Sequence, residues 1–327
     1  MFREVRRRIK SIKKEFYIRR LGDIPEPSSI QLEPTTKCNL NCLTCTRHTF
    51  SVSRLNQDLT LDEFKYIIEN IPTLRKIKIQ GMGEPFLNRH IWGILEYGIL
   101  KGIKFKTASN GTVINEGNAR NILACFTDIV VSLDSPNKEQ YEAISKGASY
   151  EKVINGVKLL VNIKKELKSK CKVMFSFVAT HLNYKELSDY FELCEKVGVD
   201  RAGVVEVENW LAPIQDQYPE NRRFIENSRK IKDEVRECVK KYKDKIKVAH
   251  LDSERRVRHC MWPKSSCFIT VDGYVTPCCL RPDPTVLNFG NIFKQPFSEI
   301  WNSNKYKEFR YLNSQGKNNV FCEICPD

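Results

Sequence analysis

The chain has 327 residues, of which 41% are hydrophobic and 29% are charged, and its formal net charge is +14. These values are typical of a soluble globular protein, and the length allows one large domain and a small one. No run of about 18 apolar residues occurs, which excludes a membrane-spanning helix.

Thirteen cysteines are many for a chain of this length. Their odd number, and an N-terminus without the apolar stretch of a secretory signal, argue against a disulfide framework. We therefore expect a cytoplasmic protein whose reduced thiols bind metal.

Residues 1–20 carry nine Arg or Lys residues against Glu4 and Glu15, a local net charge of +7. Apolar residues recur among them at helical spacing, which predicts a basic amphipathic helix within residues 1–27. Two interpretations stay open. The helix either docks to an acidic partner or an anionic surface, or packs on the main domain with its basic face in solvent.

Between residues 28 and 207, short β-rich runs alternate with amphipathic helical stretches. This alternation predicts parallel strands with crossover helices, as an open doubly wound sheet or an incomplete barrel. The expected strands are 29–35, 74–80, 103–109, 128–134, 171–180 and 201–207. The clearest expected helices are 60–71, 89–100 and 184–198.

Polar segments follow each of the first four expected strands. A cysteine cluster follows the first strand, and residues 81–85, 109–111 and 132–135 follow the next three. Because the carboxyl ends of parallel strands meet at one rim, we expect these four segments to converge there.

The cysteine cluster has the sequence "KCNLNCLTCTR" and contains Cys38, Cys42 and Cys45. Buried structural thiols are a poor explanation for so polar a segment. A zinc ion needs a fourth ligand, for which His48 is near in sequence. A [4Fe–4S] cluster with three thiolate ligands keeps one iron open for a substrate or cofactor, and we favour this interpretation.

With "GMGEP" (81–85) after the next strand, this motif resembles the radical S-adenosylmethionine (SAM) superfamily. The resemblance implies a partial (β/α)6 TIM-like barrel in which SAM chelates the open iron of the three-cysteine cluster. It further implies reductive cleavage of SAM to a 5′-deoxyadenosyl radical, which abstracts hydrogen from a substrate. An electron donor such as flavodoxin or ferredoxin is then a partner.

The resemblance also implies which residues contact SAM. Glycine allows close backbone approach to its methionine part, and a carboxylate suits its amino group. The implied SAM-binding residues are Gly81, Gly83, Glu84, Ser109, Asn110, Ser132 and Asp134. For the last four, turn capping and helix initiation are the alternative roles. Thr44 stands where the family often has an aromatic residue beside adenine, so the adenine contacts and the catalytic acid or base stay unassigned.

A charged helical linker is expected over residues 216–257, after a barrel domain over residues 28–215. Residues 258–327 form a cysteine-rich tail that resembles the SPASM/twitch extension of radical SAM enzymes. The order of a DG turn, "PC", "GN", "EIW" and a final CxxC carries this resemblance. It implies one auxiliary [4Fe–4S] cluster, because the sequence has no cysteines after the CxxC to hold a second one.

The implied auxiliary ligands are Cys260, Cys278, Cys322 and Cys325. Cys267 is the alternative to Cys260, and Cys279 is spare because it points to the opposite face of a local strand from Cys278. Without the family resemblance, zinc is the rival metal for this tail. The apolar surroundings of the remaining cysteines indicate core positions for Cys125, Cys171, Cys194 and Cys238.

A cluster with four protein ligands binds no substrate but moves electrons. We therefore expect a net two-electron oxidation, dehydrogenase-like, of a small alcohol, sugar or cyclitol. The alternative is a peptide- or protein-modifying maturase, although about 27 residues before the first strand are too few for a leader-peptide-binding domain. A non-catalytic metal-binding scaffold is a remote alternative. Glu206, Glu208 and Trp210 either line the substrate pocket or are surface or capping residues.

Overall fold

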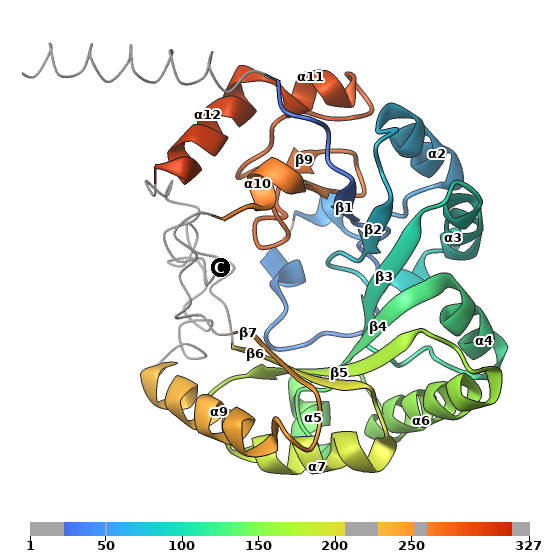
Figure 1. The fold of residues 1–327 in the computed structure, drawn as a ribbon, viewed down its shortest axis with the longest axis vertical. Helices are drawn as coiled ribbons and strands as arrows, with labels where there is room; N and C mark the ends of the chain where they lie inside the picture. Colours follow the sequence, from blue (N-terminus) through green and yellow to red (C-terminus); the bar gives the residue numbers. More distant parts are fainter. Residues whose placement is uncertain (1–22, 50, 207–227, 252–259, 316–327) are drawn as a thin grey trace, which may run out of the picture.

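The computed structural model describes residues 23–49, 51–206, 228–251 and 260–315, which form one curved sheet with helices along its outer side (Figure 1). The sheet has the strand order β7-β6-β5-β4-β3-β2-β1-β8-β9. All neighbouring strands pair in parallel except β8 and β9, which are antiparallel. The strands are β1 (Ser29–Leu32), β2 (Lys76–Ile79), β3 (Lys104–Ser109), β4 (Phe126–Ser132), β5 (Lys172–Ala179), β6 (Arg201–Glu206), β7 (Val248–Leu251), β8 (Phe268–Ile269) and β9 (Val275–Thr276).

Helices cover the outer side of the sheet, and further helices belong to the C-terminal part of the chain (Figure 1). The α-helices are α2 (Leu61–Asn70), α3 (Ile91–Leu100), α4 (Glu116–Cys125), α5 (Lys138–Ile144), α6 (Tyr150–Leu167), α7 (Leu187–Val197), α9 (Ser228–Tyr242), α10 (Trp262–Ser265), α11 (Phe297–Trp301) and α12 (Asn304–Ser314). Short 3-10 helices are η1 (Thr46–Thr49), η2 (Val52–Arg54), η3 (Pro85–Leu87) and η4 (Tyr184–Glu186). No helix among these described segments is long and apolar enough to cross a membrane.

Local sequence explains where these elements begin and which face they bury. In β2, buried Ile77 and Ile79 alternate with exposed lysines, the period-two pattern of a strand. Helix α2 begins at a capping box in which the Thr60 hydroxyl accepts from the Glu63 amide and the Glu63 carboxylate accepts from the Thr60 amide. Both signals can be read without the rest of the chain.

The α/β fold with a cysteine-rich C-terminal part is as the sequence predicts, and the six expected strands are β1 to β6. Two features go beyond that prediction. The segment expected as a helical linker contains helix α9 but also strand β7, which pairs in parallel with β6. The tail also joins the same sheet, because β8 pairs in parallel with β1. Residues 1–22, expected to hold the basic helix, lie outside the described residues.

Two glycines in helix α3 give a matched test of how tightly the outer layer packs on the sheet. A Cβ atom at Gly98 would lie 2.3 Å from the Phe105 ring of β3, whereas one at Gly93 would meet its nearest neighbour at 3.6 Å. We expect Gly98→Ala to lower the free energy of unfolding by about 1–3 kcal/mol. Gly93→Ala should raise it by about 0.5–1 kcal/mol, because alanine favours helix. Urea unfolding followed by circular dichroism compares the two, and equal midpoints would contradict close α3–β3 packing.

Candidate functional site

The three cysteines of the sequence motif lie in the loop that follows β1. Backbone amides of Asn41 and Leu43 donate to the carbonyls of Lys146 and Ile144 at 2.9 Å each, which holds the loop against the end of α5. Burial most of all, followed by the neighbouring Cys45, Asp134 and Cys38, raises the pKa of Cys42 to about 12.

Such thiols stay protonated until a cation replaces the protons, which is the behaviour of ligands whose charge a metal centre compensates. Burial likewise raises the pKa of Cys45. In the part of the chain that the structure describes, no group of three or more His, Cys, Asp or Glu side chains is arranged to hold a single metal ion. Three thiols within one loop fit an iron–sulfur cluster as donors.

The loop after β2 lies against the chain that enters the cysteine loop. Gly83 donates to the Thr35 carbonyl at 3.2 Å, and the Glu84 amide donates to the Lys37 carbonyl at 2.7 Å. A Cβ atom at Gly83 would lie 2.5 Å from each of these carbonyl oxygens. Only glycine allows this approach of two backbones, so the sequence-predicted glycine is required by the cysteine loop as well.

Glu84 joins the ends of β2 and β3. Its buried carboxylate accepts from the Asn110 amide at 2.7 Å, the Ser109 hydroxyl at 2.9 Å and the Phe86 amide at 3.3 Å. Burial raises the pKa of Glu84 to about 7, although these three donors act to lower it. The family resemblance implies that Glu84 binds the amino group of SAM. In the structure its carboxylate already accepts from three protein groups.

Asn110 and Asp134 bring the next two strand ends to the same place. The Asn110 side-chain nitrogen lies 3.9 Å from the Cys38 sulfur and donates to the Asn39 side-chain oxygen at 2.9 Å. The Asp134 carboxylate accepts from the Val178 amide at 2.9 Å, and burial raises the pKa of Asp134 to about 6. One carboxylate oxygen of Asp134 therefore anchors the loop to β5.

A cavity of about 240 Å³ lies at this rim and brings together six of the sequence-predicted site residues. These are Cys42, Cys45, Gly81, Asn110, Ser132 and Asp134. The predicted Cys38, Gly83, Glu84 and Ser109 do not line it but contact or support residues that do. Thiols, backbone glycine and polar strand-end groups around one cavity fit the cluster and the amino acid and ribose parts of SAM.

Several residues of the cavity wall are not among those predicted from the sequence. Tyr141 of α5 lines it, and its pKa is raised by burial, by Asp134 and by Cys42. Its place in a helix pattern gave no signal beyond that of a core residue. Thr44 and Met82 also line the cavity, so the position where the family often has an aromatic residue does face this space.

The predicted auxiliary ligands are only partly within the described residues. Cys260 and Cys278 are half-buried, whereas Cys322 and Cys325 lie outside the described segments. Cys267, the alternative ligand, is fully buried in the core beside β1, where its carbonyl accepts from the Gln31 amide at 3.0 Å. Of the candidate pocket residues, Glu208 and Trp210 also lie outside, as does the side chain of Glu206.

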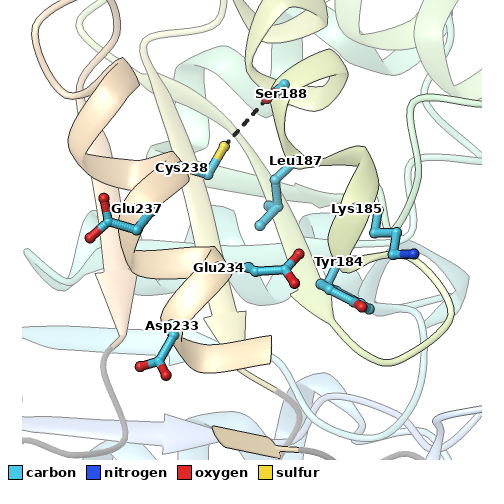
Figure 2. A pocket seen from close by; sticks show the side chains of 8 residues that line it. All are labelled: Tyr184, Lys185, Leu187, Ser188, Asp233, Glu234, Glu237 and Cys238. Atoms are coloured by element: carbon cyan, nitrogen blue, oxygen red, sulfur yellow. Dashed lines mark hydrogen bonds between the residues drawn. The ribbon is translucent and has the colours of Figure 1, made fainter. Parts of the chain in front are cut away.

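A second cavity, of about 350 Å³, lies between helices α7 and α9 in the outer layer (Figure 2). Its lining includes the acidic side chains of Asp233, Glu234 and Glu237, and the Ser188 hydroxyl lies 3.7 Å from the Cys238 sulfur. No predicted site residue lines it. The rim cavity is therefore the candidate site.

Known proteins have sequences similar to that of this chain. The chain is 30% identical over 279 residues to a probable GTP 3′,8-cyclase of Methanocaldococcus jannaschii, which covers 80% of this chain and 88% of the relative. It is 25% identical over 322 residues to an AdoMet-dependent heme synthase of Methanosarcina barkeri, covering 91% and 88%.

Among solved structures, Streptococcus suis SuiB bound to precursor peptide SuiA has a TM-score of 0.69 at 16% identity, covering 97% of this chain and 75% of that one. The pattern of the radical SAM superfamily matches residues 32–194, and that of the SPASM iron–sulfur cluster-binding domain matches residues 260–326. SAM and a [4Fe–4S] cluster are the cofactors of the first domain, and auxiliary iron–sulfur clusters are those of the second. The chain belongs to the radical SAM superfamily and carries a C-terminal SPASM domain.

Proposed function

We propose that this enzyme oxidises a small alcohol, sugar or cyclitol by two electrons, with an auxiliary cluster in its C-terminal domain as electron acceptor. The observation that carries the proposal is the pairing of β8 with β1, with Gln31 opposite Phe268 and Leu32 opposite Ile269. It attaches the cysteine-rich domain directly to the strand that leads into the cysteine loop. Electron transfer to an auxiliary cluster needs two clusters at a constant separation. A sheet shared by both domains would keep that separation constant.

In this proposal the rim cavity receives SAM. Cys38, Cys42 and Cys45 would hold the SAM-binding cluster. The cluster and SAM together would supply the radical that abstracts hydrogen from the substrate. Gly81 and Gly83 let the backbone approach SAM. The remaining proposed contacts or supports of SAM are Glu84, Ser109, Asn110, Ser132 and Asp134.

The C-terminal domain holds a single auxiliary [4Fe–4S] cluster through Cys260, Cys278, Cys322 and Cys325. Complete burial of Cys267 in the apolar core supports Cys260 as the ligand in its place. Four thiolates leave no iron open, so this cluster transfers electrons. The substrate loses a hydrogen atom to the radical, then an electron to the cluster and a proton, which together make a two-electron oxidation.

The curated relatives differ in their named products, a cyclised nucleotide and heme, so they do not indicate one substrate. A peptide is the alternative substrate, because SuiB was solved with its precursor peptide, but 16% identity supports the shared fold alone. Flavodoxin or ferredoxin is the proposed reductant. We also propose that the chain divides into residues 1–27, 28–215, 216–257 and 258–327, the first of which carries the basic helix for an acidic partner.

The first prediction concerns iron. Anaerobically reconstituted protein should carry about eight irons per chain, from two [4Fe–4S] clusters. Replacing Cys38, Cys42 and Cys45 together with alanine should leave about four irons and abolish SAM cleavage. Colorimetric iron analysis and detection of 5′-deoxyadenosine measure the two effects. Cys125→Ala, outside both sites, is the control, and unchanged iron in the triple variant would refute the ligand assignment.

A second prediction concerns the carboxylate of Asp134. If it accepts from a ribose hydroxyl of SAM, Asp134→Asn should weaken SAM binding by about tenfold, because a charge-assisted hydrogen bond is lost. Since the pKa of Asp134 is raised to about 6, wild-type affinity should fall as the pH drops from 8 to 6 and the carboxylate gains a proton. The asparagine variant should lack this dependence.

Anaerobic equilibrium dialysis with labelled SAM measures both affinities. Asp128→Asn is the matched control, since Asp128 lies in β4, the strand that leads to Asp134, but pairs with Lys106 at 3.1 Å and does not line the cavity. A pH profile shared by Asp134→Asn and the wild type would rule out the ribose role.

A third prediction tests the proposed oxidation itself. Replacing Cys322 and Cys325 with alanine should remove the auxiliary cluster, so the protein makes 5′-deoxyadenosine without oxidised product. Transfer of deuterium from labelled substrate into 5′-deoxyadenosine reports hydrogen abstraction separately from electron removal. Because a cluster also contributes to folding, circular dichroism must first show a native barrel. Cys267→Ala is the control that should keep the cluster, and normal product yield without the cluster would exclude the acceptor role.

A further inference from the structure

Glu33, the residue after strand β1, lies between two parts of the molecule that are far apart in sequence. Its carboxylate is fully buried. One oxygen, Oε1, accepts from the Met82 amide at 3.0 Å, in the loop after β2. The other, Oε2, accepts from the Val271 amide at 3.2 Å, in the C-terminal domain. The Glu33 backbone amide also donates to the Ile269 carbonyl at 2.9 Å.

The contact with the loop after β2 is close. A Cβ atom at Gly81 would lie 2.3 Å from Cγ of Glu33 and 2.7 Å from its Oε1 atom, so the Glu33 side chain fills the space beside this glycine. Gly81 and Met82 both line the rim cavity. The position of the cavity wall therefore depends directly on that of Glu33.

The contact with the C-terminal domain is reinforced by Arg54, a buried cation. Its Nη2 atom lies 3.4 Å from Oε2 of Glu33 and 3.4 Å from Oδ1 of Asp272, and its Nη1 atom lies 4.0 Å from Oδ1 of Asp283. The Thr270 hydroxyl donates to the same Asp272 oxygen. Arg54 thus connects Glu33 to the turn between β8 and β9.

These contacts need a side chain that only accepts hydrogen bonds. Oε1 faces one N–H group, and Oε2 faces a second N–H group and a guanidinium. A glutamine of the same shape has one oxygen and one NH2 group, so one of the two sides would meet donor against donor. Its oxygen is expected on the side of Val271 and Arg54, where there are two donors, which leaves the Met82 amide without its acceptor.

We propose that Glu33 is a positioning residue that couples the SAM-binding loop to the C-terminal domain, so that SAM bound at the rim stiffens the β8–β9 hairpin. This inference rests on the proposed SAM site at the rim cavity and not on the proposed oxidation. Glu33 is not among the residues that line the rim cavity. It acts through Gly81 and Met82 on one side and through Val271 and Arg54 on the other.

The test uses the full chain with both clusters reconstituted, unreduced and without substrate. In the wild type, saturating SAM should slow amide hydrogen exchange in the hairpin, residues 268–276. In Glu33→Gln, SAM should bind about three- to tenfold more weakly, as expected for one lost hydrogen bond, and should no longer slow that exchange. Equilibrium dialysis and exchange mass spectrometry give the two readouts.

Glu63→Gln is the matched control. Glu63 also accepts from a backbone amide, that of Thr60 at 2.8 Å, but only within the capping box of α2. This variant should keep the wild-type response of the hairpin to SAM. Loss of the response in Glu63→Gln as well would show a general effect of carboxylate replacement and would overturn the proposal.

If Glu33→Gln does not fold or loses iron, Asp272→Asn decides the question. It weakens only the C-terminal side of the Arg54 contact, so SAM affinity should stay within about twofold of wild type while the hairpin response shrinks. A wild-type hairpin that does not respond to SAM, or a full response in either variant, would overturn the proposed coupling. Neither result depends on substrate oxidation, which can fail or hold independently.

Discussion

The site depends on strand β1 being paired on both edges, in parallel with β2 on one side and with β8 on the other. Parallel strands end at the same rim, so the cysteine loop, the glycine loop and the turn of the C-terminal domain meet there. Close backbone contacts, such as those of Gly83 with the carbonyls of Thr35 and Lys37, then set their spacing.

Buried carboxylates connect the loops of this rim. In the core of the protein, contacts between apolar side chains have that role. Glu33 and Glu84 each accept from backbone amides of two or more separate segments. A carboxylate suits this task because both of its oxygens only accept, so it can gather N–H groups that have no other partner. Burial has a cost, visible in the raised pKa of both side chains. Directional bonds that orient the loops offset that cost.

Local patterns in the sequence predict the strands, helix α2 and the convergence of four segments on one rim, because each depends on neighbouring residues. They do not predict that Glu84 turns toward Ser109 and Asn110, since the partner of a buried carboxylate depends on which amides the fold brings near. The same holds for Tyr141, whose helix pattern resembles that of any core residue. Strand β7 was not predicted, because it belongs to a charged segment whose sequence pattern is typical of a helix.

The attachment of β8 to β1 has a consequence for how the chain is made. Glu33 and Val271 are 238 residues apart, so one edge of β1 stays unpaired until the residues of β8 have been synthesised. An open parallel edge can pair with other chains, and contacts between such distant residues form slowly. During translation the strands made before β8 therefore form a sheet with one open edge at β1. In a chain truncated before residue 268, this edge of β1 would stay unpaired and open to association with other chains.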